Sequence, residues 1–168
     1  MAVEQIIEKI IQTKDAAQLR ALDEMDLRRC LWRLDEYYYD MPFDALNHEQ
    51  KVLFLCIALE DACQADSIIS LAENGLMLRL PEVYDALMEI GALETASLVQ
   101  AFINLLPENT FRDSKLPEWD WFFEDEERAE EIDNIDGEIA DYPDGNMMYL
   151  YHRYVAKENV AEKLLLVE

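Results

Sequence analysis

Apolar residues recur at steps of three and four along most of this chain, and no other feature of the sequence limits the fold as strongly. The spacing is clearest in two runs, Leu27, Leu31, Leu34, Tyr38 and Ile132, Ile135, Ile139. Side chains three or four residues apart share one face of an α-helix, whereas a half-buried strand alternates with a period of two. We therefore predict an all-α fold, a compact multi-helix domain with at most a vestigial strand near the C-terminus.

Individual residues indicate where several helices begin and end. Asp26 is predicted to cap the helix that carries the first run. Pro81 suits a first helical turn and Gly91 suits a C-terminal cap, so these two residues bracket another helix. A further helix is predicted over residues 49–66. Because the helices are joined by short connections, residues 1–168 are predicted to form a single helical domain.

The charge balance excludes whole classes of function. The chain has 37 Asp and Glu residues against 14 Lys and Arg residues, a formal net charge of −23 at pH 7. Such a surface repels nucleic acid and anionic lipid, so we expect neither nucleic acid nor a membrane as a direct partner. The charge favours a cationic protein partner, a metal ion or simple solubility.

The acids are concentrated in residues 118–144, which hold 13 acidic residues and one basic residue, Arg128. This segment also contains the aromatic residues of 119–123 and the isoleucine run, which a solvated acidic tail lacks. We therefore predict that segment 118–144 packs on the core and forms a strongly acidic C-terminal face. The aromatic residues are predicted to anchor the segment, and a partner-binding hot spot is the alternative.

The density of these acids is close to the density of phosphates in DNA. As a single helix, 27 residues would span about 40 Å, so 13 charges would lie about 3 Å apart along the axis. One strand of B-DNA carries one phosphate per about 3.4 Å of axis. A small domain needs a net charge of only about 2–8 for solubility. An ordered array at this density therefore offers a basic protein a surface similar to a phosphate backbone.

Residue spacing indicates no catalytic or metal-binding motif. Aligning Gly137 with the glycine of a calcium loop places Ile132 and Pro143 at ligand positions, and neither side chain is a ligand. Cys56 and Cys63 share an apolar helix face and are predicted to be core thiols. The sequence has no Gly-x-Ser-x-Gly motif and no glycine-rich phosphate loop. We predict no enzyme, no catalytic residue, no cofactor and no metal site.

The remaining features favour a cytoplasmic protein. The three cysteines are an odd number, and the N-terminal residues lack the basic and apolar regions of a secretory signal. No apolar run approaches the roughly 18 residues of a membrane span. We therefore predict a cytoplasmic location with reduced thiols.

A central signature consists of Asn74-Gly75, the stretch Leu87-Met88-Glu89-Ile90-Gly91-Ala92, and Ala96 at the start of a further apolar helix. It continues into the aromatic residues of 119–123 and the acidic stretch behind them. In these features, over roughly residues 50–155, the chain resembles the small acidic bacterial DNA-mimic proteins of similar mass.

The resemblance implies an all-helical homodimer that is not an enzyme and that occupies the DNA-binding surface of a transcription factor. We accordingly predict a DNA mimic that binds a basic DNA-binding protein of helix-turn-helix type and blocks its operator binding. The residues predicted to bind this partner are acids that flank the isoleucine run: Glu124, Glu127, Glu130, Glu131, Asp133, Asp136, Glu138 and Asp141. Earlier acids are predicted to extend the negative surface, namely Asp23, Glu24 and Asp26.

Two other functions are compatible with the same sequence. An immunity-type inhibitor of a basic nuclease shares the acidity and the helices but binds an active-site cleft. A carboxylate-dependent hydrolase is the less favoured alternative, because it needs a deep pocket in which two or three acids converge.

Overall fold

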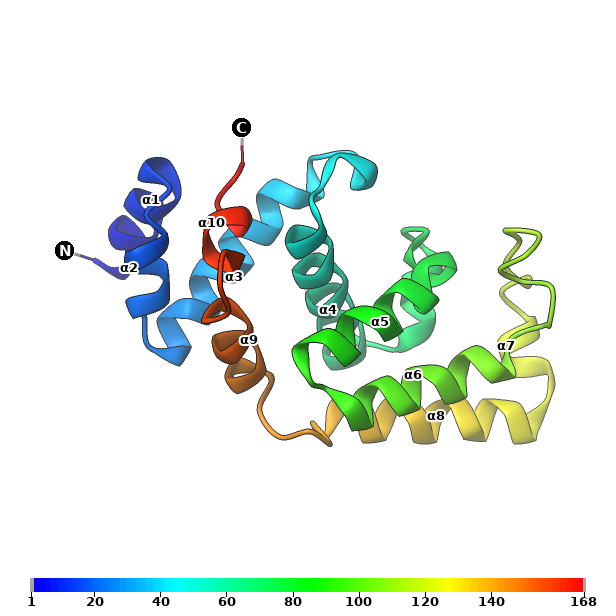
Figure 1. Ribbon diagram of the computed structural model, residues 1–168. Coiled ribbons are helices and arrows are strands. Elements are labelled where there is room, and N and C mark those ends of the chain that lie inside the picture. Colours follow the sequence, from blue (N-terminus) through cyan, green and yellow to red (C-terminus); the bar gives the residue numbers. More distant parts are fainter. Residues whose placement is uncertain (1, 168) are drawn as a thin grey trace. The chain divides into compact units, whose positions relative to one another are not determined.

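Helices make up most of the protein, as drawn in Figure 1, a computed structural model that describes residues 2–167. The connections are mostly short, as predicted, but residues 106–120 form a long connection without a helix. Within residues 2–167 there are ten α-helices, three short 3-10 helices and no strand. The all-α prediction is confirmed. In chain order the elements are α1 (Val3–Thr13), α2 (Ala16–Ala21), α3 (Glu24–Tyr39), η1 (Phe43–Ala45), α4 (His48–Ala65), η2 (Ile68–Ala72), η3 (Leu76–Arg79), α5 (Leu80–Ile90), α6 (Leu93–Leu105), α7 (Trp121–Glu124), α8 (Glu126–Ala140), α9 (Met147–Val155) and α10 (Val160–Leu164).

The helices divide into two compact units. Unit 1 comprises Met1–Ile57 and Asn146–Glu168, and unit 2 comprises Ala58–Gly145. The division falls inside α4. The single domain predicted over residues 1–168 stays a prediction.

Unit 1 is organised around α3. Its predicted apolar run is confirmed, because Leu27, Leu31, Leu34 and Tyr38 are all buried with at most 1% exposure. Helices α1, α2 and α9 pack against α3, and α10 packs against α2 and α9. The Tyr38 hydroxyl donates a 2.5 Å hydrogen bond to the carbonyl of Leu164. Burial raises the pKa of this hydroxyl.

The N-terminal cap of α3 is Asp23, so the prediction that Asp26 caps this helix is wrong. The Asp23 carboxylate accepts a hydrogen bond of 2.9 Å from the backbone N–H of Asp26. Asp26 lies in the first turn, where a negative charge favours the helix dipole, and it pairs with Arg29 at 3.0 Å. The cap therefore sits three residues earlier than predicted.

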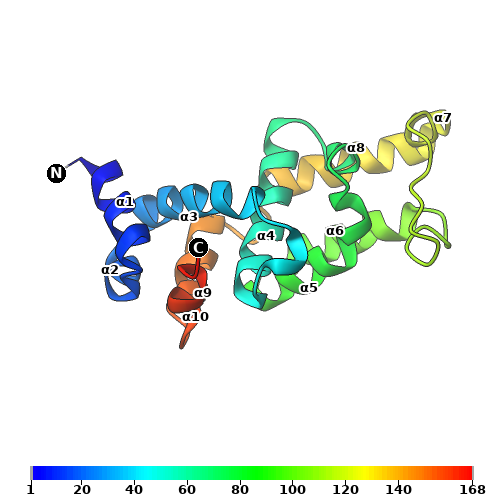
Figure 2. The same ribbon diagram turned by 90° about the horizontal axis from the view of Figure 1, so that it is seen from above.

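Unit 2 contains α5, α6 and α8, and α6 lies between the other two in both views (Figures 1 and 2). The predicted boundaries of α5 are confirmed. Pro81 stands in its first turn, and Gly91 ends it at a φ of 91°, a left-handed conformation that favours glycine. Val99 and Phe102 of α6 are completely buried. The helix predicted over residues 49–66 is α4.

Two further predictions bear on the environment of the protein. Cys30, Cys56 and Cys63 are all buried, and this confirms the prediction that Cys56 and Cys63 pack in the core. Burial raises the pKa of the Cys30 thiol to about 12. In residues 2–167 no helix combines the length and the apolar character that crossing a bilayer requires.

Candidate partner-binding surface

Helix α8 directs its isoleucine run inward, as the spacing predicts. Ile132, Ile135 and Ile139 are buried with at most 5% exposure, and the helix packs along α6 (Figure 1). Asp125 caps its N-terminus, because the Asp125 carboxylate accepts a 2.8 Å hydrogen bond from the backbone N–H of Arg128. The isoleucine side fixes α8 on unit 2 and leaves the opposite side to solvent.

Seven of the eight residues predicted to bind a partner are exposed. At about 100° per residue, those on α8 and its C-terminal cap cover about 160° of the helix circumference, centred opposite the isoleucines. Glu126, also exposed on α8, was missed by the predicted set although it belongs to the same acidic stretch. We call the seven exposed residues the outer acidic face: Glu124, Glu127, Glu130, Glu131, Asp133, Glu138 and Asp141.

Asp136, the eighth predicted residue, is half-buried and turns toward the body of unit 2. Its carboxylate accepts hydrogen bonds from the Ser67 hydroxyl at 2.5 Å and from the backbone N–H of Ile68 at 2.8 Å. Burial raises the pKa of Asp136, the two hydrogen bonds oppose that shift, and the charges of Asp133 and Asp66 add to it. Asp136 therefore ties α8 to the start of η2 and stands apart from the other seven.

A second acid of the segment, Asp144, also has a structural role. It accepts hydrogen bonds of 2.8 Å from the backbone N–H groups of Glu94 and Thr95, and one of 2.7 Å from the Thr95 hydroxyl. These groups lie in the first turn of α6, whose own N-cap residue, Ala92, has no capping side chain. Asp144 thus caps a helix that lies about 50 residues earlier in the chain.

Little positive charge accompanies the outer acidic face. Arg128 is the one basic residue of segment 118–144, and its guanidinium lies 3.8 Å from the centre of the Trp121 ring. The same group donates a hydrogen bond to the Trp121 carbonyl. Because Arg128 is engaged with Trp121, it is turned to α7 and not to the carboxylates of the outer acidic face.

Two carboxylates of the outer acidic face lie at the C-terminal end of α8, where negative charge is unfavourable. Glu138 lies in the last turn of α8 and Asp141 is its C-cap residue, and the last turn contains no basic residue. The C-terminal end of a helix carries partial negative charge, so acids there are unfavourable by about 0.3–1 kcal/mol each. Glu138 and Asp141 therefore do not stabilise α8 through its helix dipole.

The aromatic residues of 119–123 divide between core and surface. Phe122 is buried at 1% exposure, as expected of an anchor, but Trp119 and Phe123 are 48% and 55% exposed. The prediction that the whole cluster anchors the segment is therefore wrong for these two rings. Helix α7 has a single turn, and neighbouring side chains on it point about 100° apart. Phe122 is the side chain of this turn that is buried in the core.

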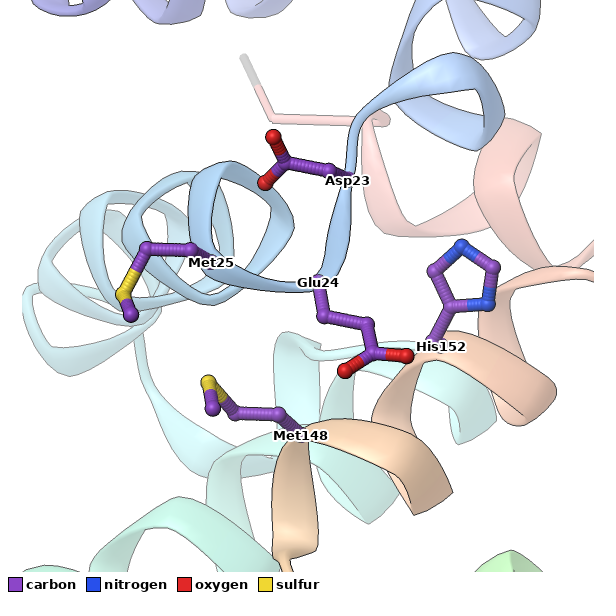
Figure 3. Close-up of a pocket in the computed structure, with 5 residues that line it drawn as sticks. All are labelled: Asp23, Glu24, Met25, Met148 and His152. Atoms are coloured by element: carbon purple, nitrogen blue, oxygen red, sulfur yellow. The ribbon is translucent and has the colours of Figure 1, made fainter.

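A hollow of about 440 Å³ in unit 1 is a different kind of candidate site (Figure 3). It is lined by Asp23, Glu24, Met25, Met148 and His152. The Glu24 carboxylate points toward the His152 ring, whereas the Asp23 carboxylate points away from it and accepts the capping hydrogen bond of α3. The hollow does not bring two carboxylates together, so it gives the hydrolase alternative no support.

A metal site is another kind of site that acidic residues can form. Among residues 2–167, no group of three His, Cys, Asp or Glu side chains is arranged to hold a metal ion. Cys63 lies near Asp136, with 3.9 Å between Sγ and a carboxylate oxygen, and burial raises the pKa of its thiol. A protonated, buried thiol of this kind packs in the core and is not a good ligand.

Comparison with known proteins identifies a family. A family model described as DMP19-like protein matches residues 44–159, a range close to the one over which the sequence showed its resemblance. No curated protein and no solved structure matches the chain. Since the family model covers more than half of the chain, the protein belongs to the DMP19-like family, a family of DNA mimics.

Proposed function

We propose that this protein binds the DNA-binding surface of a basic transcription factor of helix-turn-helix type and thereby blocks operator binding. The observation that carries the proposal is the outer acidic face, seven exposed carboxylates on α7, α8 and the C-cap of α8. Membership of a DNA-mimic family supports the same function. The homodimer implied by the resemblance is part of the proposal.

The charge density of α8 supports the mimicry. Segment 118–144 is not one continuous helix, because α7 ends at Glu124 and α8 begins at Glu126. The path from Glu126 to Asp141 still spans about 22 Å at 1.5 Å per residue. With Glu126 counted, seven exposed acids lie along this path, on average about 3.8 Å apart along the axis. This spacing is close to the 3.4 Å or so of axis per phosphate in one DNA strand.

Competition with DNA follows from this charge array. A helix-turn-helix protein contacts phosphates with Lys and Arg side chains around its recognition helix. The same cations would pair with the outer acidic face, so the regulator could not hold its operator at the same time. Because the attraction is largely between charges, we expect the complex to weaken by about 1,000-fold or more between about 50 and 200 mM salt.

The roles of the acids differ within this proposal. Asp136 and Asp144 accept hydrogen bonds from unit 2, and they hold α8 and α6 in place. The outer acidic face supplies the charges that meet the partner. In this proposal, Asp136 and Asp144 stabilise the fold, and the outer acidic face binds the partner.

A gel-shift competition tests the proposed function. The partner is first captured from native lysate at low salt and identified by mass, and the regulator, its operator DNA and this protein are then mixed. We expect the protein to release free DNA in proportion to its concentration. A ternary complex that still contains DNA would contradict the mimicry and indicate an ordinary protein–protein adaptor. Inhibition of a captured nuclease would indicate the immunity-type function instead.

A further inference from the structure

Two aromatic rings on α7 and the residues before it are exposed side by side. Trp119 is 48% exposed and Phe123 is 55% exposed, and their ring centres lie 5.8 Å apart with a tilt of 56° between the planes. Trp119 also meets the buried Phe122 ring edge-on at 6.1 Å. The exposed pair therefore packs against a buried side chain of the core, which helps to hold the Trp119 ring in place.

Acidic residues precede and follow Trp119 and Phe123 in the sequence. Glu118, Asp120, Glu124 and Asp125 are all exposed and are its sequence neighbours. An exposed apolar pair whose sequence neighbours carry negative charge suits a group that is both planar and positive. An arginine guanidinium meets this description, because it stacks on aromatic faces and donates to carboxylates in the same pose.

The molecule already contains one such contact, a few residues away. The Arg128 guanidinium lies 3.8 Å from the centre of the Trp121 ring and donates a hydrogen bond to the Trp121 carbonyl. Trp121 is thus covered by an arginine of the chain itself. Trp119 and Phe123 have the same ring chemistry and remain exposed.

We propose that Trp119 and Phe123 form an arginine-binding anchor, on which an arginine of the partner stacks while its N–H groups donate to the flanking carboxylates. This proposal rests on the proposed function, since it assigns the short-range part of the same partner contact. The outer acidic face attracts any cationic surface, whereas the anchor selects arginine. Lysine carries a compact, strongly hydrated charge and stacks less well on a ring.

A second copy of this chain is a poor occupant for the anchor. Unit 2 carries 23 acidic and 4 basic residues, a formal charge of −19. Pairing two copies through these rings would bring Glu118, Asp120, Glu124 and Asp125 of one chain against the same acids of the other. Like charges in contact oppose association, so charge complementarity favours an arginine-rich partner.

Binding of oligoarginine and oligolysine of equal length to the full chain tests the anchor. Titrations at about 0.3 M salt suppress the long-range attraction, because the Debye length is then well below 10 Å. We expect the unaltered protein to prefer oligoarginine by about 10-fold, and the double variant W119A/F123A to reduce this preference to about 2-fold or less. Oligolysine affinity should change by less than about 2-fold in the same variant.

Two control variants separate the anchor from the outer acidic face. Y39A/Y149A removes two exposed rings of unit 1, which are 68% and 59% exposed, and should keep the arginine preference. The variant E127K/E130K/E131K should weaken both peptides alike and also keep the preference. Loss of that preference in Y39A/Y149A, or its survival in W119A/F123A, would overturn the anchor.

The remaining outcomes are decided by two further measurements. Sedimentation that shows W119A/F123A to dissociate a homodimer would assign the rings to a second copy and overturn the proposal. Circular dichroism guards against misfolding, and the milder variant F123L should show a partial loss of preference if W119A/F123A has reduced helicity. The outer acidic face is tested with the same peptides at about 50 mM salt, where the attraction between charges is only weakly screened. If both peptides then bind equally well to E127K/E130K/E131K and to the unaltered protein, the proposed function fails, while the anchor is judged separately by its arginine preference.

Discussion

Unit 1 and unit 2 are built from the same kind of amphipathic helix, but they differ widely in charge. Unit 2 has 23 acidic and 4 basic residues, which gives −19, and unit 1 has 14 acidic and 10 basic residues, which gives −4. The two values sum to the −23 of the whole chain. The acidity is therefore a property of one region, and a general need for solubility does not explain it.

The ion pairs follow the same division. In unit 1, Arg33 pairs with Glu8 at 2.7 Å and Lys163 pairs with Glu49 at 2.6 Å, and each pair joins residues far apart in the chain. In unit 2, Arg79 pairs with Glu82 at 2.9 Å, a neighbour on the same stretch of chain. Several cations of unit 1 thus connect different elements, and further ion pairs lie within α3. Unit 2 has only 4 basic residues for its 23 acids, so most of these acids cannot pair with a cation of the same unit.

The largest effect should come from reversing charge in unit 2. We expect E127K/E130K/E131K to lower affinity for the transcription factor by more than about 1,000-fold, because three attractive charges become repulsive. A single reversal such as E130K should cost about 10-fold, since the other charges of the array remain. Titration of the partner gives the dissociation constants, and circular dichroism checks that helicity is kept.

The matched control for this reversal lies in unit 1. The variant E4K/D40K/E158K changes three exposed acids by the same total charge. We expect it to lower affinity by less than about 10-fold, since only long-range attraction is reduced. Equal losses in the two triple variants would show that net charge, and not the outer acidic face, determines binding.

The next largest effect separates acids that fold unit 2 from acids that bind. We expect D144A to lower the free energy of unfolding by about 2 kcal/mol, because two backbone N–H groups and a hydroxyl at the start of α6 lose their acceptor. The exposed neighbour D141A should leave stability within about 0.5 kcal/mol. Urea unfolding of the two variants measures the difference, and similar losses in both would contradict the capping role.

Local features of the sequence were enough to predict much of this fold. The spacing of Ile132, Ile135 and Ile139 gave the orientation of α8, and the pair Pro81 and Gly91 gave the ends of α5. Each of these signals acts within one or two helical turns, where residue type and position decide the conformation. The cap of α3 was misplaced because Asp23 and Asp26 are both good capping residues and lie only three positions apart.

The candidate site was predictable only in part, because its acids differ through distant contacts. Asp136 and Asp141 look alike in the sequence, yet Asp136 is half-buried beside Ser67 and Asp141 is exposed. The role of Asp144 depends on Thr95, which lies on another helix. Trp119 and Phe122 look equally apolar, and only the packing of α7 makes one exposed and the other buried.

A smaller effect should appear in the pH dependence of stability. The pKa of Asp136 is raised in the folded protein, so the folded state binds more protons than the unfolded state near that pKa. Its contribution to stability is complete below the unfolded pKa and is lost as pH rises through the folded one. Repulsion among the negative charges of the outer acidic face also opposes the compact state, and salt screens this repulsion.

We therefore expect the free energy of unfolding to be lower at pH 8 than at pH 5, and added salt to restore part of it at pH 8. In D136N the fall of stability with rising pH should be smaller, because the titrating group has been replaced by a neutral one of the same shape. Denaturant melts across this range give the slopes. If stability instead rises from pH 5 to pH 8, the stabilisation by acids that are paired or hydrogen-bonded exceeds the repulsion among neighbouring acids.

The smallest effect offers the sharpest comparison between stability and binding within unit 2. Glu138 and Asp141 lie at the C-terminal end of α8, where their charges oppose the helix dipole. The variant E138Q/D141N should therefore raise the free energy of unfolding by about 0.6 kcal/mol, while it weakens partner binding by about 3- to 10-fold. A gain in stability together with a loss of partner affinity would mean that these acids contribute to binding although they destabilise the helix. If the variant lost stability, the two carboxylates would have a structural role like that of Asp144, and the outer acidic face would shrink to the N-terminal part of α8 and Glu124.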